Sequence, residues 1–244
     1  MRVDAIALHL RPRSMSEASD LGVRLVQANA RSVWACYAPV WAVVTLIALA
    51  FGSIESWLPG LILFWCKPWL DRTLVYTLSR AVFGTRTSLA DVWLAQREVW
   101  WQQLLATLTL RRLSPWRSYT QPALQLEGQR GAAWRARRRQ LLRGKQGAAL
   151  AMHSAFAQIE ALLLIGVMVL VVWFAPEPSQ SGLFDMLFRS EHDIGQWLAT
   201  IAYAGIVLVI EPFYVGAGFA MYLNRRVELE AWDVEQEFRL AFAS

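Results

Sequence analysis

The chain carries little charge for its length. Of its 244 residues 18% are Asp, Glu, Lys or Arg, whereas a soluble domain has about 25%. Hydrophobic residues make up 56% and the mean hydropathy is +0.31, which favours a membrane protein. The net charge of +5 would suggest nucleic acid in a soluble protein. Because the arginines flank apolar runs, we expect no nucleic-acid partner.

Residues that build metal sites, disulfides or catalytic centres are also scarce. Cys36 and Cys66 lie inside apolar runs and are expected to be small buried hydrophobes. The three histidines stand in separate regions without Cys or carboxylate neighbours at ligand spacing. No H-E-x-x-H, G-x-S-G or paired-Asp signature occurs in the apolar runs. We therefore expect no metal, no cofactor and no enzymatic activity.

Four apolar runs are each long enough to cross a bilayer, which takes about 20 residues. They cover residues 32–52, 57–78, 155–175 and 197–223, with Trp at several of their ends. Tryptophan is frequent at both interfaces of a membrane. The sequence therefore predicts an all-α membrane protein with about four transmembrane helices, accompanied by interfacial or amphipathic helices.

Three segments lie outside these runs. Residues 1–31 are expected to form a cytoplasmic N-terminal segment with an amphipathic helix after Ser14, and residues 224–244 a cytoplasmic amphipathic tail. Residues 84–147 form a basic insert. Within it, residues 89–110 are apolar over only about a dozen positions, which suits an interfacial helix or a shallow re-entrant hairpin better than a span.

The distribution of basic residues predicts an orientation. Residues 111–145 hold ten Lys and Arg against one acid, and Arg225-Arg226 follow the last run. The turn at 53–56 and the acidic segment 176–196 lack this excess. The positive-inside rule therefore predicts a multi-pass protein of the bacterial inner membrane with both termini in the cytoplasm.

Ionisable residues inside the apolar runs are costly and point to a polar interior. Glu211 stands mid-run before Pro212, and we expect it to pair with Lys67 or Arg72. Such residues either hold the helices together or line a transport route. The polar residues expected inside the membrane are Lys67, Asp71, Arg72, Glu160 and Glu211.

Two segments are expected to contact lipids or partners. In the basic insert, Trp134, Arg135, Arg137, Arg138 and Arg139 fit either the anionic surface of the inner membrane or a purely topological role. In the tail, an apolar stripe with Trp232 and Phe238 fits either packing on the basic insert or docking of a partner protein.

Several short motifs resemble those of known bacterial membrane proteins. Residues 213–214 and 222–233 (FY … YLNRRVELEAWD) resemble the close of polytopic proteins that include the membrane domains of glycerophosphodiester phosphodiesterases. Residues 57–60, 67–72 and 113–118 (WLPG, KPWLDR, LSPWRS) are similar to the N-terminal membrane region of proteins of unknown function encoded beside MoxR-type ATPases. This resemblance implies an inner-membrane protein, with a MoxR-type ATPase system as one conceivable partner. It implies no catalytic residue.

These observations favour a non-enzymatic membrane component that acts as a scaffold or subunit of an envelope complex. The expected partners are the bilayer, its anionic lipids, and other membrane or cytoplasmic proteins. The alternative is a transporter, channel or lipid-handling protein that uses the intramembrane charges Lys67, Asp71 and Glu211.

Overall fold

The computed structural model describes residues 13–102, 104–109, 112–188 and 193–230. The described residues form helices and turns, with no strand among them. The helices are α1 (Met15–Ala28), α2 (Ala30–Ala50), η2 (Phe51–Ser53), α3 (Leu58–Ala81), α4 (Leu89–Leu94), η3 (Arg97–Trp101), α5 (Leu104–Leu108), α6 (Arg117–Leu126), α7 (Gly131–Leu142), α8 (Gln146–Trp173), α9 (Glu177–Phe188) and α10 (Asp193–Glu230).

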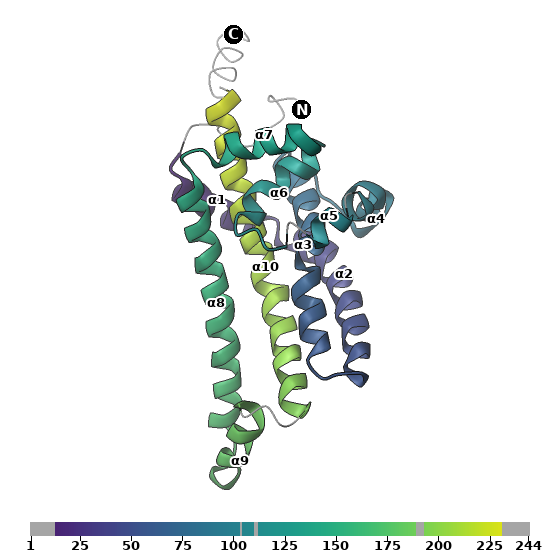
Figure 1. The fold of residues 1–244 in the computed structure, drawn as a ribbon, viewed down its shortest axis with the longest axis vertical. Helices are drawn as coiled ribbons and strands as arrows, with labels where there is room; N and C mark the ends of the chain where they lie inside the picture. The colour runs from purple at the N-terminus through teal and green to yellow at the C-terminus, as the bar shows by residue number, and fades with distance from the viewer. Residues whose placement is uncertain (1–12, 103, 110–111, 189–192, 231–244) are drawn as a thin grey trace.

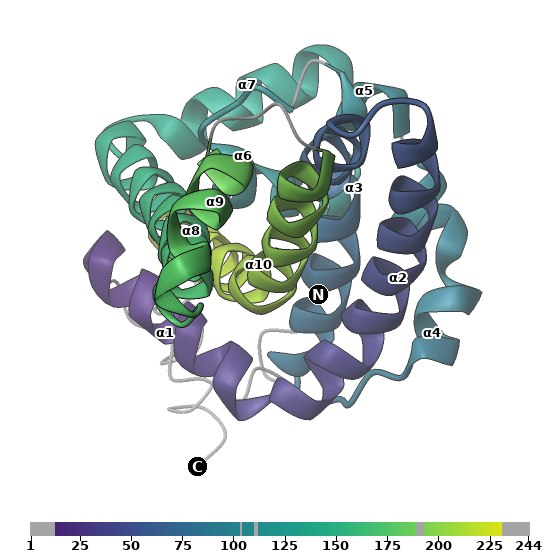
Figure 2. The same ribbon diagram turned by 90° about the horizontal axis from the view of Figure 1, so that it is seen from below.

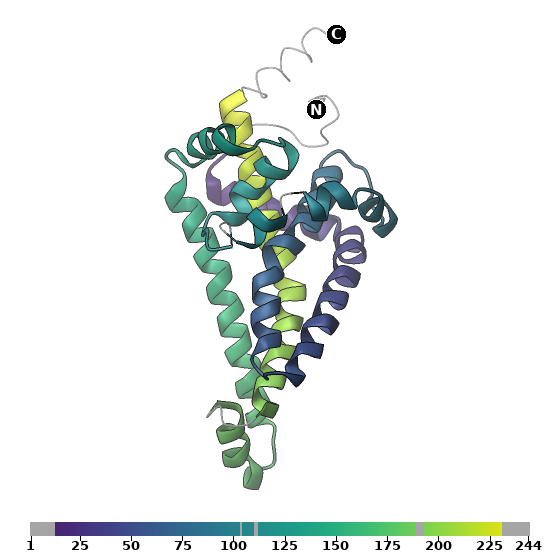
Figure 3. The same ribbon diagram turned by 45° about the vertical axis from the view of Figure 1, so that its right-hand side comes forward.

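The molecule consists of four long helices that run along its longest axis and of shorter helices gathered mainly at one end (Figure 1). Helices α2, α3, α8 and α10 run along that axis. Helices α1 and α4 to α7 gather at one end, which we call the head, while α9 lies at the other end. Figure 3 shows α8 and α2 diverging from α10 towards the head.

Three helices are long and apolar enough to cross a membrane. They are residues 30–53 (α2 with η2), α8, and residues 195–230 of α10. Helix α3 matches the predicted run 57–78 in position, but it carries Lys67, Asp71, Arg72 and Arg80 and does not reach the same apolar character. The predicted count of four spans is therefore not confirmed.

Helix α8 is exposed along almost its whole length. Only 6% of its most apolar stretch is buried, against 39% for α10. It begins at Gln146, well before the predicted start at residue 155, because residues 147–152 continue the helix without a break. Its packing is mainly against α10. Most of its apolar surface thus faces away from the protein.

Helix α10 is continuous through Pro212. Proline has no N–H, so the carbonyl of Leu208 loses its partner one turn earlier. The indole Nε1 of Trp34, on α2, donates to that carbonyl at 3.2 Å. Trp41 donates in the same way to the carbonyl of Ala204 at 3.0 Å. Two indoles therefore join α2 to α10, and that of Trp34 does so at the carbonyl that Pro212 leaves without its helical partner.

Helix α1 packs across α10 through two glycines. A Cβ on Gly22 would lie 2.2 Å from the carbonyl oxygen of Gly216, and a Cβ on Gly216 would lie 2.5 Å from Val26. Ser14 caps α1 as predicted, accepting from the Glu17 N–H at 3.2 Å. The side chain of Asn224 then binds both the N–H and the carbonyl of Arg13, each at 2.9 Å. The beginning and the end of the described chain are thereby joined.

The segment predicted as one interfacial or re-entrant piece, residues 89–110, is broken into short helices on the side of α3 (Figure 1). Helices α4 and α5 have six and five residues, far too few to cross a bilayer at 1.5 Å per residue. One side buries Val92, Val99 and Trp100, and the other exposes Trp93 and Leu94. A further difference concerns residues 176–196, where α9 replaces the expected turns.

Candidate functional site: a buried ion network and the cavity beside it

Four helices bring charged side chains together at one buried point. Glu211 of α10 accepts from Lys67 of α3 at 2.7 Å and from Arg117 of α6 at 2.7 Å. The Nε of Arg117 lies 2.9 Å from Asp71 Oδ2, and Lys67 Nζ lies 2.6 Å from Glu160 of α8. Apart from Glu160, these side chains are at most 8% exposed. We call these five residues the ion network.

The network places opposite charges in alternation, so each charge has a nearby counter-charge. Lys67 and Asp71 are one turn apart on α3 and therefore share a face. Burial disfavours the charged guanidinium of Arg117, but the carboxylates of Asp71 and Glu211 outweigh this effect and raise the pKa of Arg117. A buried ion network of this kind fixes how helices meet more than it adds net stability.

Four of the five predicted intramembrane residues belong to this network, and the expected pairing of Glu211 with Lys67 is confirmed. The alternative pairing of Glu211 with Arg72 is wrong. Arg72 follows Asp71 directly and so points about 100° away around the helix. Arg117 was missed, because the basic insert was interpreted as a segment outside the membrane layer. The signal was the charge imbalance of three predicted intramembrane acids against the two cations Lys67 and Arg72.

Arg72 instead holds the broken segment beside α3. Residues 97–101 form a π-helical turn whose carbonyls lack regular helical partners. The guanidinium of Arg72 donates to the carbonyls of Glu98, at 2.7 Å, and of Val99. Trp100 adds a hydrogen bond from its indole to Thr73 at 2.9 Å. Arg72 therefore has a structural role in satisfying buried backbone groups.

A cavity of about 490 Å³ lies beside the ion network. Its walls come from α3, α8 and α10, and residues 112–117 roof it. The charged side chains that line it include those of Lys67, Arg117, Glu160 and Glu211. The rest of the lining is largely aromatic and aliphatic: Phe64, Leu113, Phe156, Leu164, Tyr203, Ile210 and Tyr214. Its volume is within the roughly 300–1,000 Å³ range of ligand sites.

Arg112 is a buried cation at the roof of this cavity. Its side chain is 8% exposed, and its guanidinium stacks on Phe64 with 3.6 Å between Cζ and the ring centroid. Its buried Nε has no hydrogen-bond partner, and neither has the hydroxyl of Ser114. Within the part of the chain that the structure describes, Arg112 forms no ion pair with a carboxylate. Burial lowers the pKa of Arg112.

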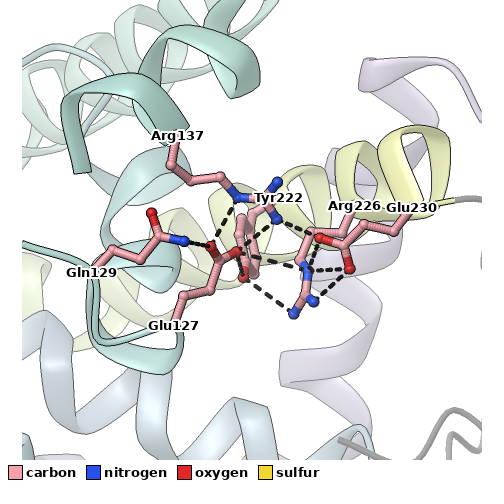
Figure 4. A network of polar contacts seen from close by, with 6 residues as sticks. All are labelled: Glu127, Gln129, Arg137, Tyr222, Arg226 and Glu230. Carbon is pink, nitrogen blue, oxygen red and sulfur yellow. Dashed lines mark hydrogen bonds and ion pairs between the residues drawn. The ribbon is translucent and has the colours of Figure 1, made fainter. Parts of the chain in front are cut away.

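A second polar network, shown in Figure 4, fastens the head to the end of α10. Glu127 accepts two hydrogen bonds from Arg137, at 2.8 and 2.9 Å, and one from the Tyr222 hydroxyl at 2.8 Å. Arg137 also binds Glu230, which in turn pairs with Arg226 at 2.6 Å. Burial opposes the charge of Arg137, but Glu127 and Glu230 outweigh it and raise the pKa of Arg137.

Of the residues in the basic insert that were predicted to contact lipids or partners, some therefore face the protein interior and others face outward. Arg137 binds Glu127 and Glu230, so assigning it to lipid contact was wrong. Arg138 lies over Trp116, 5.4 Å from its ring centroid, and Trp134 packs partly buried against the core. Arg135 and Arg139 are exposed. The two tail residues predicted to contact lipids or partners, Trp232 and Phe238, lie outside the described residues.

No group of three or more metal-ligating side chains occurs within the described ranges. The chain was also compared with protein-family models, with curated proteins and with solved structures, and none of the three comparisons gave a match.

Proposed function

We propose that the chain is a multi-pass protein of the bacterial inner membrane with α3 as a fourth span and the head in the cytoplasm. The basic insert lies in the head and the acidic α9 at the opposite end (Figure 1), in line with the positive-inside rule. Glu211 and Glu160 are each about 20 Å along their helices from Trp197 and Trp173. With these indoles at the outer interface, the ion network lies in the inner half of a layer of about 30 Å.

Reporter fusions test this orientation. Fusions after Glu55 and after Gly182 are expected to report an external position, and one after Gly131 a cytoplasmic position, because Gly131 begins α7 in the head. Alkaline phosphatase and green fluorescent protein give opposite readouts for the two sides. A cytoplasmic signal at Gly182 would contradict the four-span arrangement, and an external signal at Gly131 would reverse the orientation.

We further propose that the protein is a non-enzymatic scaffold or subunit of an envelope complex, and that α7 is its docking surface. One observation carries this proposal: Arg130, Arg135, Arg139 and Arg143 are exposed along α7 and its ends, and none of them forms an ion pair within the described ranges. Helix α7 lies on the head at the end away from α9 (Figure 1). This position favours a water-soluble partner with an acidic surface over the bilayer.

The polar network around Glu127 and Arg137 supports the same role, because it fixes the head rigidly to α10. Arg137 and Glu127 join α7 and α6 to α10, and Lys145 pairs with Glu228 of α10 at 3.0 Å. Docking on α7 would thus be transmitted directly to a membrane helix. A MoxR-type ATPase system stays a conceivable partner on the resemblance alone. Transport through Lys67, Asp71 and Glu211 is less favoured, since each already has a counter-charge.

Site-specific photo-crosslinking in cells tests the docking proposal. A photoreactive amino acid at Gln140, exposed on α7, is expected to give a discrete protein adduct that disappears when Arg135 and Arg139 are both changed to Glu. The double change Arg86→Glu and Arg97→Glu alters the charge of the head equally at other exposed sites and should leave the adduct intact. No adduct, or one insensitive to Arg135→Glu/Arg139→Glu, would contradict a docking role for α7.

A further inference from the structure

We infer that the cavity beside the ion network binds the headgroup of an anionic phospholipid, with Arg112 as the residue that contacts its phosphate. The inference does not depend on the scaffold role of α7, which uses other residues at the far end of the head. It starts from a charge that the protein leaves without a partner inside a cavity of ligand size.

The charges around the cavity identify the sign of the ligand. Glu211 and Glu160 are engaged by Lys67, and Asp71 and Glu211 by Arg117. Within the part of the chain that the structure describes, the guanidinium of Arg112 stacks on the face of Phe64 and forms no ion pair, and its Nε is buried without an acceptor. Buried charges are normally paired. An anionic oxygen is the acceptor this position lacks, and the free hydroxyl of Ser114 supplies a neutral donor beside it.

The walls identify the ligand as amphiphilic. The remaining lining is mainly apolar, with Phe156 and Leu164 on α8 and Ile210 on α10. A small hydrophilic anion would gain little from such walls, whereas the methylenes at the start of a lipid's acyl chains are stabilised by burial against them. Guanidinium groups match phosphate oxygens in geometry as well as charge. The combination selects a phosphate attached to acyl chains.

The cavity also has a route to the bilayer. Its lining includes exposed residues on three elements: Phe64 of α3 at 43%, Leu113 at 77%, and Ala161 of α8. Seen from below in Figure 2, α8 and α3 stand on either side of α10, with α6 behind the space between them. The exposed lining residues on α3 and α8 place the mouth of the cavity between these two helices. A lipid of the adjacent leaflet enters sideways, with its chains along the exposed apolar surface of α8.

A zwitterionic lipid fits this site less well. Its own ammonium group would lie beside the guanidinium of Arg112, and the carboxylates that could attract it, Glu160 and Glu211, are already paired with Lys67 and Arg117. An anionic lipid such as phosphatidylglycerol brings one negative charge and no cation. The site should therefore discriminate between lipid classes by headgroup charge and not by chain length.

Native mass spectrometry of the purified full chain, with equimolar phosphatidylglycerol and phosphatidylcholine of matched chains, measures this discrimination. We expect the native chain to retain phosphatidylglycerol about tenfold more, equal to about 1.4 kcal/mol. Arg112→Gln should reduce the preference to about twofold or less, while Arg112→Lys keeps part of it. Arg139→Gln, the same charge change on exposed α7, should leave it unchanged. Millimolar glycerol 3-phosphate should not displace the lipid.

A blocking variant keeps the test decisive if Arg112→Gln does not fold. Ala161 is exposed at the mouth, so Ala161→Phe should preserve folding while it reduces the retention of phosphatidylglycerol at least fivefold. Equal retention of the two lipids by the native chain would overturn the inference, as would an undiminished preference in Arg112→Gln or in Ala161→Phe. Displacement by glycerol 3-phosphate would overturn the assignment to a membrane lipid. A failed crosslink at α7 would bear on the scaffold role alone.

Discussion

Replacing Arg117 by Met is expected to destabilise the protein more than the loss of any exposed charge. Arg117 is 5% exposed and pairs with both Asp71 and Glu211. Its removal leaves Asp71 without its ion-pair partner. Glu211 keeps only Lys67, which also pairs with Glu160. Breaking a buried pair in this way costs about 3–5 kcal/mol, which at about 2–4 °C per kcal/mol lowers the melting temperature by about 10 °C. Differential scanning fluorimetry of the detergent-solubilised chain measures the change.

A rescue separates charge from packing. Adding Asp71→Asn to Arg117→Met removes one of the stranded charges and should restore part of the loss, whereas Arg139→Met, on the surface of α7, should change the melting temperature by less than about 2 °C. The same logic applies to Lys67→Met with Glu211→Gln. Effects that simply add in either double variant would show that these pairs are not energetically coupled.

A methyl group at the crossing of α1 and α10 is expected to separate the two helices. In Gly22→Ala the new Cβ would meet backbone atoms of Gly216 and Ala217 at 2.2–2.7 Å. Backbone cannot rotate away as a side chain can, so α1 must shift. Overpacking of this kind costs about 3 kcal/mol or more. Limited trypsin digestion should then cut at Arg24, inside α1, or at Arg31, in the first turn of α2, because α1 no longer lies on α10.

Gly205→Ala is the matched control, because Gly205 lies on α10, the other helix of the crossing, and a Cβ built there has no atom within 4 Å. There alanine should be neutral or stabilise the helix by up to about 1 kcal/mol. Equal trypsin sensitivity in Gly22→Ala and Gly205→Ala would mean that the crossing is not closely packed.

Periodicity and hydropathy were sufficient for the long helices but not for the polar interior. The helix after Ser14 and the apolar runs follow from spacing along one element, and the pairing of Lys67 with Glu211 follows from the need of a carboxylate in an apolar run for a counter-charge. Arg117 and Arg112 could not be found this way. They lie in a segment rich in Arg, and only the tertiary path of residues 112–117 under the head brings them to α3 and α10.

The arginine run on α7 shows the same limit on a smaller scale. Arg135, Arg137 and Arg139 look equivalent in a list of basic residues, yet successive helical positions differ by about 100°. The middle one turns inward to Glu127 while its neighbours face solvent. Which residue of such a run is internal depends on the position of acids on other helices, here Glu127 and Glu230.

The packing of α1 against Gly216 determines the order in which the helices assemble during synthesis. The helix Met15–Ala28 leaves the ribosome long before the surface that receives it, because that surface and the Asn224 side chain that binds Arg13 belong to the last described helix. At about 5–20 residues per second, α1 waits for about 10–40 s with its apolar face uncovered. During that interval the nearest apolar environment for this face of α1 is the membrane surface. Helix α1 therefore reaches its final place by transfer from lipid to protein, and this crossing closes only after α10 has been synthesised.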